Sequence, residues 1–134
     1  MIYLDTAAII KLIRNEPESD ALFDWLDGRS GELLVSSALA EVEVPRGLRR
    51  AEPALLAAIP SVLARIAICE IDESVRSAAA AYNDPLLRSL DAIHLATAQV
   101  VLGGDLKAFV TYDKRLLATA DALGVPTARP GSGR

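Results

Sequence analysis

Four acidic residues stand at places in the sequence where their carboxylates could act together. They are Asp5, Glu43, Asp91 and Asp113. Carboxylates crowded at one place repel each other, and without a cation some of them would bind protons. A hard divalent ion relieves that repulsion, and Mg²⁺ typically binds one or two carboxylates together with water and phosphate oxygens. The chemistry that these residues suggest is therefore that of a divalent metal site.

The hydropathy pattern predicts the elements that must position these acids. Short apolar runs alternate with longer helical patterns, which indicates parallel strands joined by crossover helices. Strands are expected at 2–5, 33–35 and 108–111, with a strand or apolar connector at 65–70 and a further short strand around Val125. In the first half of the chain, helices are expected at 7–14, from Pro17 to Gly28 and from Ser36 or Ser37 to about Arg50, and a further helix is expected to begin at Pro53. In the second half, helices are expected from Asp72 or Ser74 to Tyr82, at 89–102 and at 113–123. The prediction is one α/β domain with a central, mostly parallel sheet and helices on both faces.

The expected topology brings the acids to one edge of that sheet. Binding sites in open parallel sheets form at the carboxyl ends of the strands. Asp5 closes the first strand, Asp113 follows a later strand, and Asp91 lies in the first turn of a helix. Glu43 lies inside the helix after the second strand, so its side chain can reach the same edge.

Each acid also has an ordinary structural explanation when it is taken alone. Asp113 could be only a helix N-cap, and Asp91 could only complement a helix dipole. Glu43 could be a solvated helix residue. Asp5 is flanked by apolar residues, so its ionised carboxylate needs a cation or donors such as the Thr6 hydroxyl or a helix N-terminus. The four acids together favour a functional site more strongly than any one of them does.

The helix that carries Glu43 contains two unusual residues. Gly47, one turn further on, is either a helix-packing glycine or a position that leaves room for a ligand. Pro45 removes a backbone hydrogen bond to Glu41 and is expected to bend the helix axis. The direction of Glu43 is therefore the hardest of the four to predict.

Length and composition limit the classes of protein that need considering. The 134 residues suffice for one domain, expected at 1–126, with a flexible tail at 127–134. A net charge of −4 and only 4% aromatic residues give no overall sign of a nucleic-acid-binding protein. A single cysteine, Cys69, has apolar neighbours and is expected to be a buried thiol in a reducing compartment. We see no secretory signal and no long apolar segment, and we therefore expect a cytoplasmic protein with no membrane span.

Four segments contain these acids, namely Met1-Ile-Tyr-Leu-Asp-Thr6, Glu43-Val-Pro-Arg-Gly47, Ser89-Leu-Asp-Ala-Ile-His-Leu-Ala-Thr-Ala98 and Val110-Thr-Tyr-Asp-Lys-Arg-Leu116. They resemble the sequence blocks of PIN-domain proteins and, more narrowly, of the VapC toxins of bacterial toxin–antitoxin modules. The likeness runs in order from Met1 to about Pro126. In this pattern Asp5, Glu43, Asp91 and Asp113 match the acidic positions of the family site. The spacing to Gly47 makes Glu43 a better match than Glu41, and Pro45 departs from the pattern.

The resemblance implies a metal-dependent endoribonuclease that hydrolyses RNA to leave a 5′-phosphate and a 3′-hydroxyl. We expect Asp5 and Asp91 to bind a first Mg²⁺ or Mn²⁺. Asp113 and Glu43 would complete the shell, orient water or recruit a second ion. The resemblance also implies a VapB-like antitoxin as partner and a homodimer. Two alternatives stay open, namely a PIN-like scaffold that binds RNA or protein without cutting, and a phosphate-handling α/β domain built around Asp5.

Several further residues have both a functional and a structural interpretation. His94 has no second His or Cys partner, so we expect it to pack or hydrogen-bond near the site. The stripe Leu22, Trp25 and Leu26 is expected in the core, with a groove for a partner helix as the alternative. Basic residues that could bind phosphates, or could equally be solvated charges, are Lys11, Arg14, Arg46, Arg49, Arg50, Arg88, Lys114 and Arg115.

Overall fold

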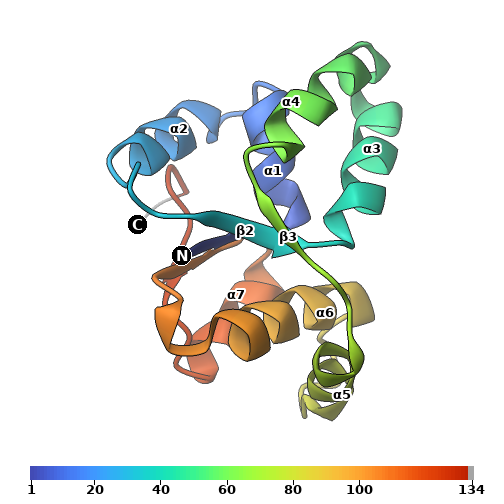
Figure 1. Cartoon of the computed structure of the whole chain (residues 1–134), viewed down its shortest axis with the longest axis vertical. Helices are drawn as coiled ribbons and strands as arrows, with labels where there is room; N and C mark the ends of the chain where they lie inside the picture. The colour runs from blue at the N-terminus through green and yellow to red at the C-terminus, as the bar shows by residue number, and fades with distance from the viewer. Residues whose placement is uncertain (133–134) are drawn as a thin grey trace.

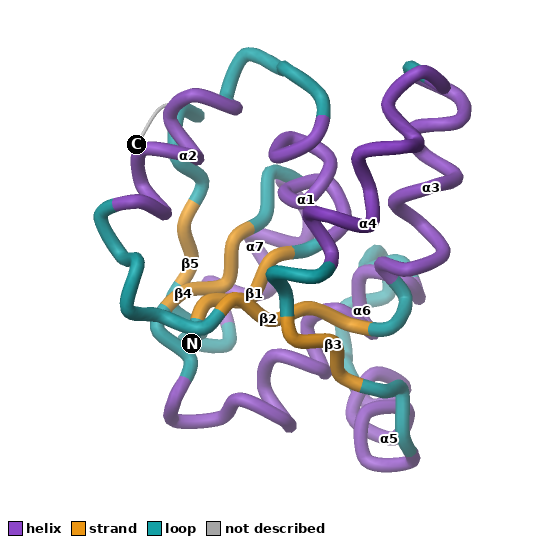
Figure 2. The backbone as a smooth tube through the Cα atoms, turned by 45° about the horizontal axis from the view of Figure 1, so that its top comes forward, coloured by secondary structure: helices purple, strands orange, loops and turns teal. Residues whose placement is uncertain are grey.

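The short apolar runs form one sheet of parallel strands in the computed structural model, which describes residues 1–132. The strands are β1 (Ile2–Leu4), β2 (Leu34–Ser37), β3 (Ala67–Cys69), β4 (Ala108–Val110) and β5 (Thr127–Ala128). Their order across the sheet is β3-β2-β1-β4-β5, so the first strand of the chain lies in the middle (Figure 2). Such an order requires crossover connections, and the helices supply them.

The helices cover both faces of the sheet. They are α1 (Thr6–Ile13), α2 (Ser19–Asp27), α3 (Ala40–Ala51), α4 (Ile59–Leu63), α5 (Glu73–Ala81), α6 (Ser89–Thr97) and α7 (Lys114–Ala122). Helices α1 to α4 lie on one face and α5 to α7 on the other (Figure 1). The predicted α/β architecture is therefore confirmed. None of the helices in residues 1–132 is long and apolar enough to cross a bilayer.

The pleat of β1 divides the core into two parts. Ile2 and Leu4 pack with α1, α2 and α3, whereas Tyr3 points the other way and packs with α6 and α7. All three side chains are fully buried, as alternation on a central strand requires. The predicted stripe on α2 also packs on the first core, with Leu22 buried and Trp25 partly buried.

Several element boundaries differ from the sequence-based predictions. Ser36 and Ser37 lie in β2 and do not cap α3, whose first residue is Ala40. The helix expected at 89–102 changes after Thr97 into a π-helical turn, Ala98–Leu102. This turn ends at Gly103, whose φ of +52° favours glycine.

The C-terminal segment also differs from expectation. The last strand is Thr127–Ala128, within the segment expected to be a tail, and not at Val125. The Tyr112 hydroxyl donates to the Pro130 carbonyl at 2.9 Å, which ties the segment after β5, as far as Pro130, to the domain. Residues 133–134 of the expected tail lie outside the described residues. Cys69, expected to be buried, is only partly buried on β3.

Candidate active site

Two of the four acids follow neighbouring strands at the same edge of the sheet. Leu4 at the end of β1 pairs with Val110 at the end of β4. The backbone N–H of Asp5 donates to the Val110 carbonyl at 3.3 Å, so the chain leaves β1 beside β4. Asp113 follows β4 after a short connection and begins α7. The predicted placement of Asp5 and Asp113 at one sheet edge agrees with this geometry.

Asp5 is almost completely buried, with 5% of its surface exposed. Its Oδ1 accepts the backbone N–H of Ala8 at 2.9 Å and thereby caps α1. Burial raises the pKa of Asp5, and hydrogen bonds from Thr111 and from the backbone N–H of Ala8 oppose that shift without cancelling it. The negative charge of Asp113 also raises this pKa. An ionised Asp5 is therefore unfavourable unless a cation lies close to it.

Asp91 faces the same edge from the first turn of α6. Its side chain is 24% exposed. Burial raises the pKa of Asp91, and the charges of Asp113 and Asp5 raise it further. The three aspartates thus act on one another electrostatically, as carboxylates that share a site do.

The two carboxylate oxygens of Asp113 have different partners, one in the cap of α7 and one in the Arg88 side chain. Its Oδ1 accepts the backbone N–H of Leu116 at 2.8 Å and caps α7. Its Oδ2 lies 3.5 Å from Nη2 of Arg88, while Nε of the same guanidinium lies 3.8 Å from Oδ2 of Asp91. Because the Arg88 side chain is 80% exposed, this bridge is a weak, solvated one.

Glu43 reaches the site from α3. Its Oε1 accepts the Thr6 hydroxyl at 2.5 Å and lies 3.0 Å from Nε2 of His94. Burial alone would raise the pKa of Glu43, but the hydrogen bonds from His94 and Thr6 lower it overall. Helix α3 continues through Pro45, and Glu41 is exposed. Glu43, and not the exposed Glu41, is thus the acid of α3 that contacts Thr6 and His94.

Gly47 is a packing glycine. A Cβ built at this position would lie 2.8 Å from Cδ1 of Ile10 on α1. This close approach of α3 to α1 leaves no room for a ligand at Gly47. It also holds the helix that carries Glu43 next to Thr6, the first residue of α1.

His94 joins the two parts of the site. It is 2% exposed and contacts both Glu43 and Thr6. The expectation that His94 would hydrogen-bond near the site is confirmed. Its other ring nitrogen, Nδ1, lies 2.6 Å from the Tyr3 hydroxyl, a contact that we did not predict. In residues 1–132 no three Asp, Glu, His or Cys side chains are already arranged as ligands of one ion.

Two of the basic residues considered for RNA binding serve a different purpose. Lys11 is paired with Glu16 at 2.9 Å and Glu18 at 3.1 Å, and its ammonium lies 4.7 Å from the centre of the Tyr112 ring. Arg14 also pairs with Glu16, at 2.9 Å. These contacts join α1 to the start of α2, so the structure contradicts a phosphate-binding role for these two side chains.

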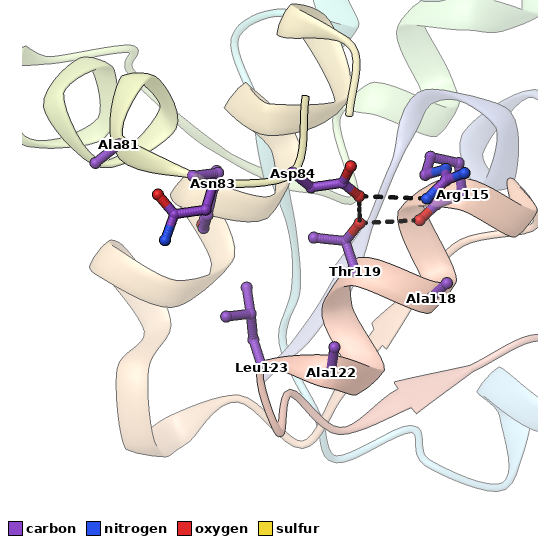
Figure 3. A pocket seen from close by; sticks show the side chains of 9 residues that line it. Ala81, Asn83, Asp84, Arg115, Ala118, Thr119, Ala122 and Leu123 are labelled. Carbon is purple, nitrogen blue, oxygen red and sulfur yellow. Dashed lines mark hydrogen bonds and ion pairs between the residues drawn. The ribbon is translucent and has the colours of Figure 1, made fainter. Parts of the chain in front are cut away.

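A pocket of about 430 Å³ lies outside the acidic edge, between α7 and the segment that leads from α5 to α6. Asp84 stands at one side of it (Figure 3). Its Oδ2 accepts the Thr119 hydroxyl at 2.9 Å and lies 3.5 Å from Nη1 of Arg115. Its Oδ1 accepts the backbone N–H of Leu86 at 2.9 Å. Asp84 therefore fixes the segment before α6 onto α7, and so helps to place Asp91 opposite Asp113. No sequence motif around Asp84 indicates this role.

The PIN domain family matches residues 2–122. The chain belongs to this family. This PIN domain is 56% identical over 135 residues to Ribonuclease VapC35 of Mycobacterium tuberculosis, with 100% of both chains covered. It is 44% identical over 129 residues to Ribonuclease VapC46 of the same species, covering 96% of this chain and 97% of that one. The 56% identity with VapC35 over the full length of both chains places this protein among the VapC-type PIN domains and confirms the resemblance.

The fold of this PIN domain is also similar to a chain in the crystal structure of VapBC2 from Rickettsia felis bound to a DNA fragment from their promoter. The TM-score is 0.73 at 14% identity, and the match covers 97% of this chain and 99% of that chain. A toxin–antitoxin complex from Klebsiella pneumoniae gives a TM-score of 0.67 at 20% identity, covering 97% and 98%. These likenesses support the fold that places the acids at one edge of the sheet.

Proposed function

We propose that this VapC-type PIN domain is a metal-dependent endoribonuclease and the toxin of a toxin–antitoxin pair. The observation that carries the proposal is the convergence of Asp5, Asp91 and Asp113 at one sheet edge, with Glu43 hydrogen-bonded to Thr6, the residue after Asp5. The full-length similarity to proteins named ribonucleases supports the same activity.

The donor set fits a divalent cation. Asp5 and Asp113 each commit Oδ1 to a helix cap, which leaves one oxygen of each carboxylate for another partner. The pKa of Asp5 and of Asp91 is raised by burial and by the neighbouring aspartates, so a cation is the group that stabilises their ionised forms. We assign Mg²⁺ or Mn²⁺ to Asp5 and Asp91, with Asp113 and Glu43 completing the site. A bound ion would activate water and offset charge on the phosphodiester.

Glu43 handles the proton of the attacking water in the proposed hydrolysis. Glu43, kept ionised by its two donors, orients the attacking water and accepts a proton from it. Water adds to phosphorus as the bond to the 3′-oxygen breaks, and that oxygen takes a proton from solvent water while Glu43 returns its proton to solvent. The products are a 3′-hydroxyl and a 5′-phosphate.

RNA would approach the acids past exposed basic side chains. Arg88 lies over Asp91 and Asp113, and Lys114 follows Asp113 directly. On α3, Arg46, Arg49 and Arg50 are also exposed. These local charges provide phosphate contacts on a chain whose net charge is −4.

The proposed partners follow from the family. Structures with this fold include toxin–antitoxin complexes, and we propose a VapB-like antitoxin that inhibits this chain. We also propose a homodimer and action in the cytoplasm, where RNA is available.

The test is cleavage of total cellular RNA by the purified, antitoxin-free protein with Mg²⁺ or Mn²⁺, and with EDTA. Asp5→Asn keeps the acceptor that caps α1 but removes the charge, so discrete fragments should vanish in this variant and in EDTA. Asp72→Ala is the matched control, since Asp72 caps α5 through the N–H of Val75. It should still cut. No cleavage by folded, metal-loaded protein would favour the alternative of a binding scaffold, and a covalent phosphoryl label on Asp5 would favour the phosphate-handling alternative.

A further inference from the structure

The imidazole of His94 connects the core strand β1 to the carboxylate of Glu43. His94 is the only histidine of the chain and is 2% exposed. Its Nδ1 lies 2.6 Å from the Tyr3 hydroxyl, and its Nε2 lies 3.0 Å from Glu43 Oε1. Both ring nitrogens therefore have partners, one in the core and one in the proposed active site.

We propose that Tyr3 and His94 form a positioning relay for Glu43, in which Tyr3 donates to Nδ1 of a neutral imidazole whose Nε2–H donates to Glu43. This inference rests on the proposed function insofar as Glu43 is taken to act on water. It adds two residues to the machinery of that reaction, neither of which touches the substrate.

The core side of the relay is rigid. The Tyr3 ring is fully buried and stacked on Phe109, with ring centres 5.2 Å apart and planes at 12°. It meets the His94 ring edge-on at 5.8 Å. A phenol carries its hydrogen at neutral pH and can donate it, so the nitrogen that accepts it must lack one. In a neutral imidazole the remaining hydrogen is then on Nε2.

The active-site side of the relay acts on one oxygen of Glu43. Oε1 receives the Thr6 hydroxyl at 2.5 Å and the Nε2–H of His94 at 3.0 Å. Thr6 Oγ1 also lies 3.0 Å from Nε2, so the three groups form a closed triangle. With Oε1 held by two donors, the direction of the carboxylate is fixed and Oε2 remains for water or a cation. Fixing a general base in this way is how a residue outside the substrate contacts raises the reaction rate.

A pair of amide substitutions separates the two halves of the relay. The amide of glutamine reaches about as far as Nε2, and the amide of asparagine about as far as Nδ1. We expect His94→Gln to donate to Glu43 and to keep cleavage within about tenfold of the wild type. We expect the asparagine of His94→Asn to hydrogen-bond with Tyr3 but not with Glu43. This variant should lose about a hundredfold in kcat, the loss typical of a misplaced catalytic group.

A double-mutant cycle tests whether the effect passes through Glu43. In the His94→Asn background, adding Glu43→Gln should cost much less than it does in the wild type, because the base is already misplaced. Equal losses for His94→Gln and His94→Asn, or fully additive losses with Glu43→Gln, would overturn the relay.

The tautomer can be measured without any activity. In tag-free protein labelled with ¹⁵N at the histidine ring, the single histidine gives one pair of ring nitrogens. At neutral pH we expect Nε2 to carry hydrogen and Nδ1 to carry none, and Tyr3→Phe to shift the Nδ1 resonance. Hydrogen on Nδ1, or an Nδ1 resonance unaffected by Tyr3→Phe, would refute the relay even if the protein cuts RNA. If the expected tautomer is found but no RNA is cut, the proposed function fails and the hydrogen-bond arrangement stands.

Discussion

Asp5 and Asp113 play the same capping role after the neighbouring parallel strands β1 and β4. Each follows its strand, and each caps the next helix by accepting the backbone N–H three residues later, at 2.9 Å and 2.8 Å. The N-cap and active-site explanations are therefore compatible, since the cap uses only Oδ1 of each carboxylate and leaves Oδ2 out of the cap. Capping also fixes the rotamer of each side chain, which holds the free oxygens in place before any ligand binds.

This double use predicts that charge and capping can be separated at Asp113. Asp113→Asn keeps an acceptor for the N–H of Leu116, whereas Asp113→Ala removes it. Both variants should lose about 10²–10³-fold in RNA cleavage, because both lack the charge. Only the alanine variant should lose about 1 kcal/mol of unfolding free energy in urea.

The cap on α5 provides the control for that experiment. Asp72→Ala removes an equivalent cap on Val75, at 3.0 Å, away from the aspartates. It should lower the unfolding free energy to a similar extent and leave cleavage intact. Wild-type cleavage by Asp113→Asn would mean that the charge of Asp113 has no part in the reaction.

The raised pKa of Asp5 predicts a pH-dependent stability in metal-free protein. Because burial raises this pKa in the folded state, the folded protein binds a proton at a pH where the unfolded chain has released it. Wild-type stability should therefore fall as the pH rises through the raised pKa. Asp5→Asn keeps the cap without the charge, so its advantage over the wild type should grow from acidic to neutral pH in urea unfolding with EDTA.

Glu43 should behave in the opposite way. Its pKa is lowered by hydrogen bonds from His94 and Thr6, so its charge stabilises the folded state at neutral pH and loses that effect as the pH falls through the lowered value. Glu43→Gln should therefore be less stable than the wild type at neutral pH, with the difference closing in acid. A difference that does not change with pH for either variant would contradict this account of the site.

The sequence allowed the acids and the fold to be predicted because both depend on local patterns. Asp5 stands directly after an apolar strand and Asp113 three residues after the end of another, and parallel strands bring their carboxyl ends to one edge. The contact between Tyr3 and His94 joins residues 91 positions apart. It depends on which way each side chain points across the core, and no local pattern carries that information.

Other differences from the prediction had local causes. Lys11 is followed by Glu16 and Glu18, and these acids take it out of the set of exposed cations. The strand Thr127–Ala128 has only two residues, too few for the alternation that predicts a strand.

Arg88 should contribute to RNA binding through charge. It is an exposed cation that pairs with both Asp91 and Asp113, and these contacts, at 3.8 Å and 3.5 Å, are long enough to be exchanged for a phosphate. Arg88→Ala should raise KM and reduce the slope of log affinity against log salt by about 0.7, the value for one contact to single-stranded RNA. Competition binding at several salt concentrations measures this.

Arg29 is the matched control for that measurement. It precedes β2, at the opposite edge of the sheet from the aspartates, and its guanidinium lies over the Trp25 ring at 4.0 Å. Arg29→Ala should leave the salt slope unchanged. Equal slopes for Arg88→Ala and the wild type would remove Arg88 from the proposed RNA contacts.

The contact between Gly47 and Ile10 predicts a coupling between two substitutions. Gly47→Ala gains about 1 kcal/mol in helix propensity but places Cβ against Cδ1 of Ile10. Ile10→Val removes that Cδ1 atom, so the alanine should fit without displacing α3 from α1. In urea unfolding, Gly47→Ala should therefore be more favourable in the Ile10→Val background than in the wild type, by at least about 0.5 kcal/mol. Gly31→Ala, whose Cβ would meet nothing within 4 Å, should show no coupling to Ile10→Val.

Because Glu43 lies one turn from Gly47, the Gly47→Ala variant should also lose part of its cleavage rate, and adding Ile10→Val should restore it. Additive stabilities and an unchanged rate would show that α1 and α3 tolerate a wider spacing than the position of Glu43 requires.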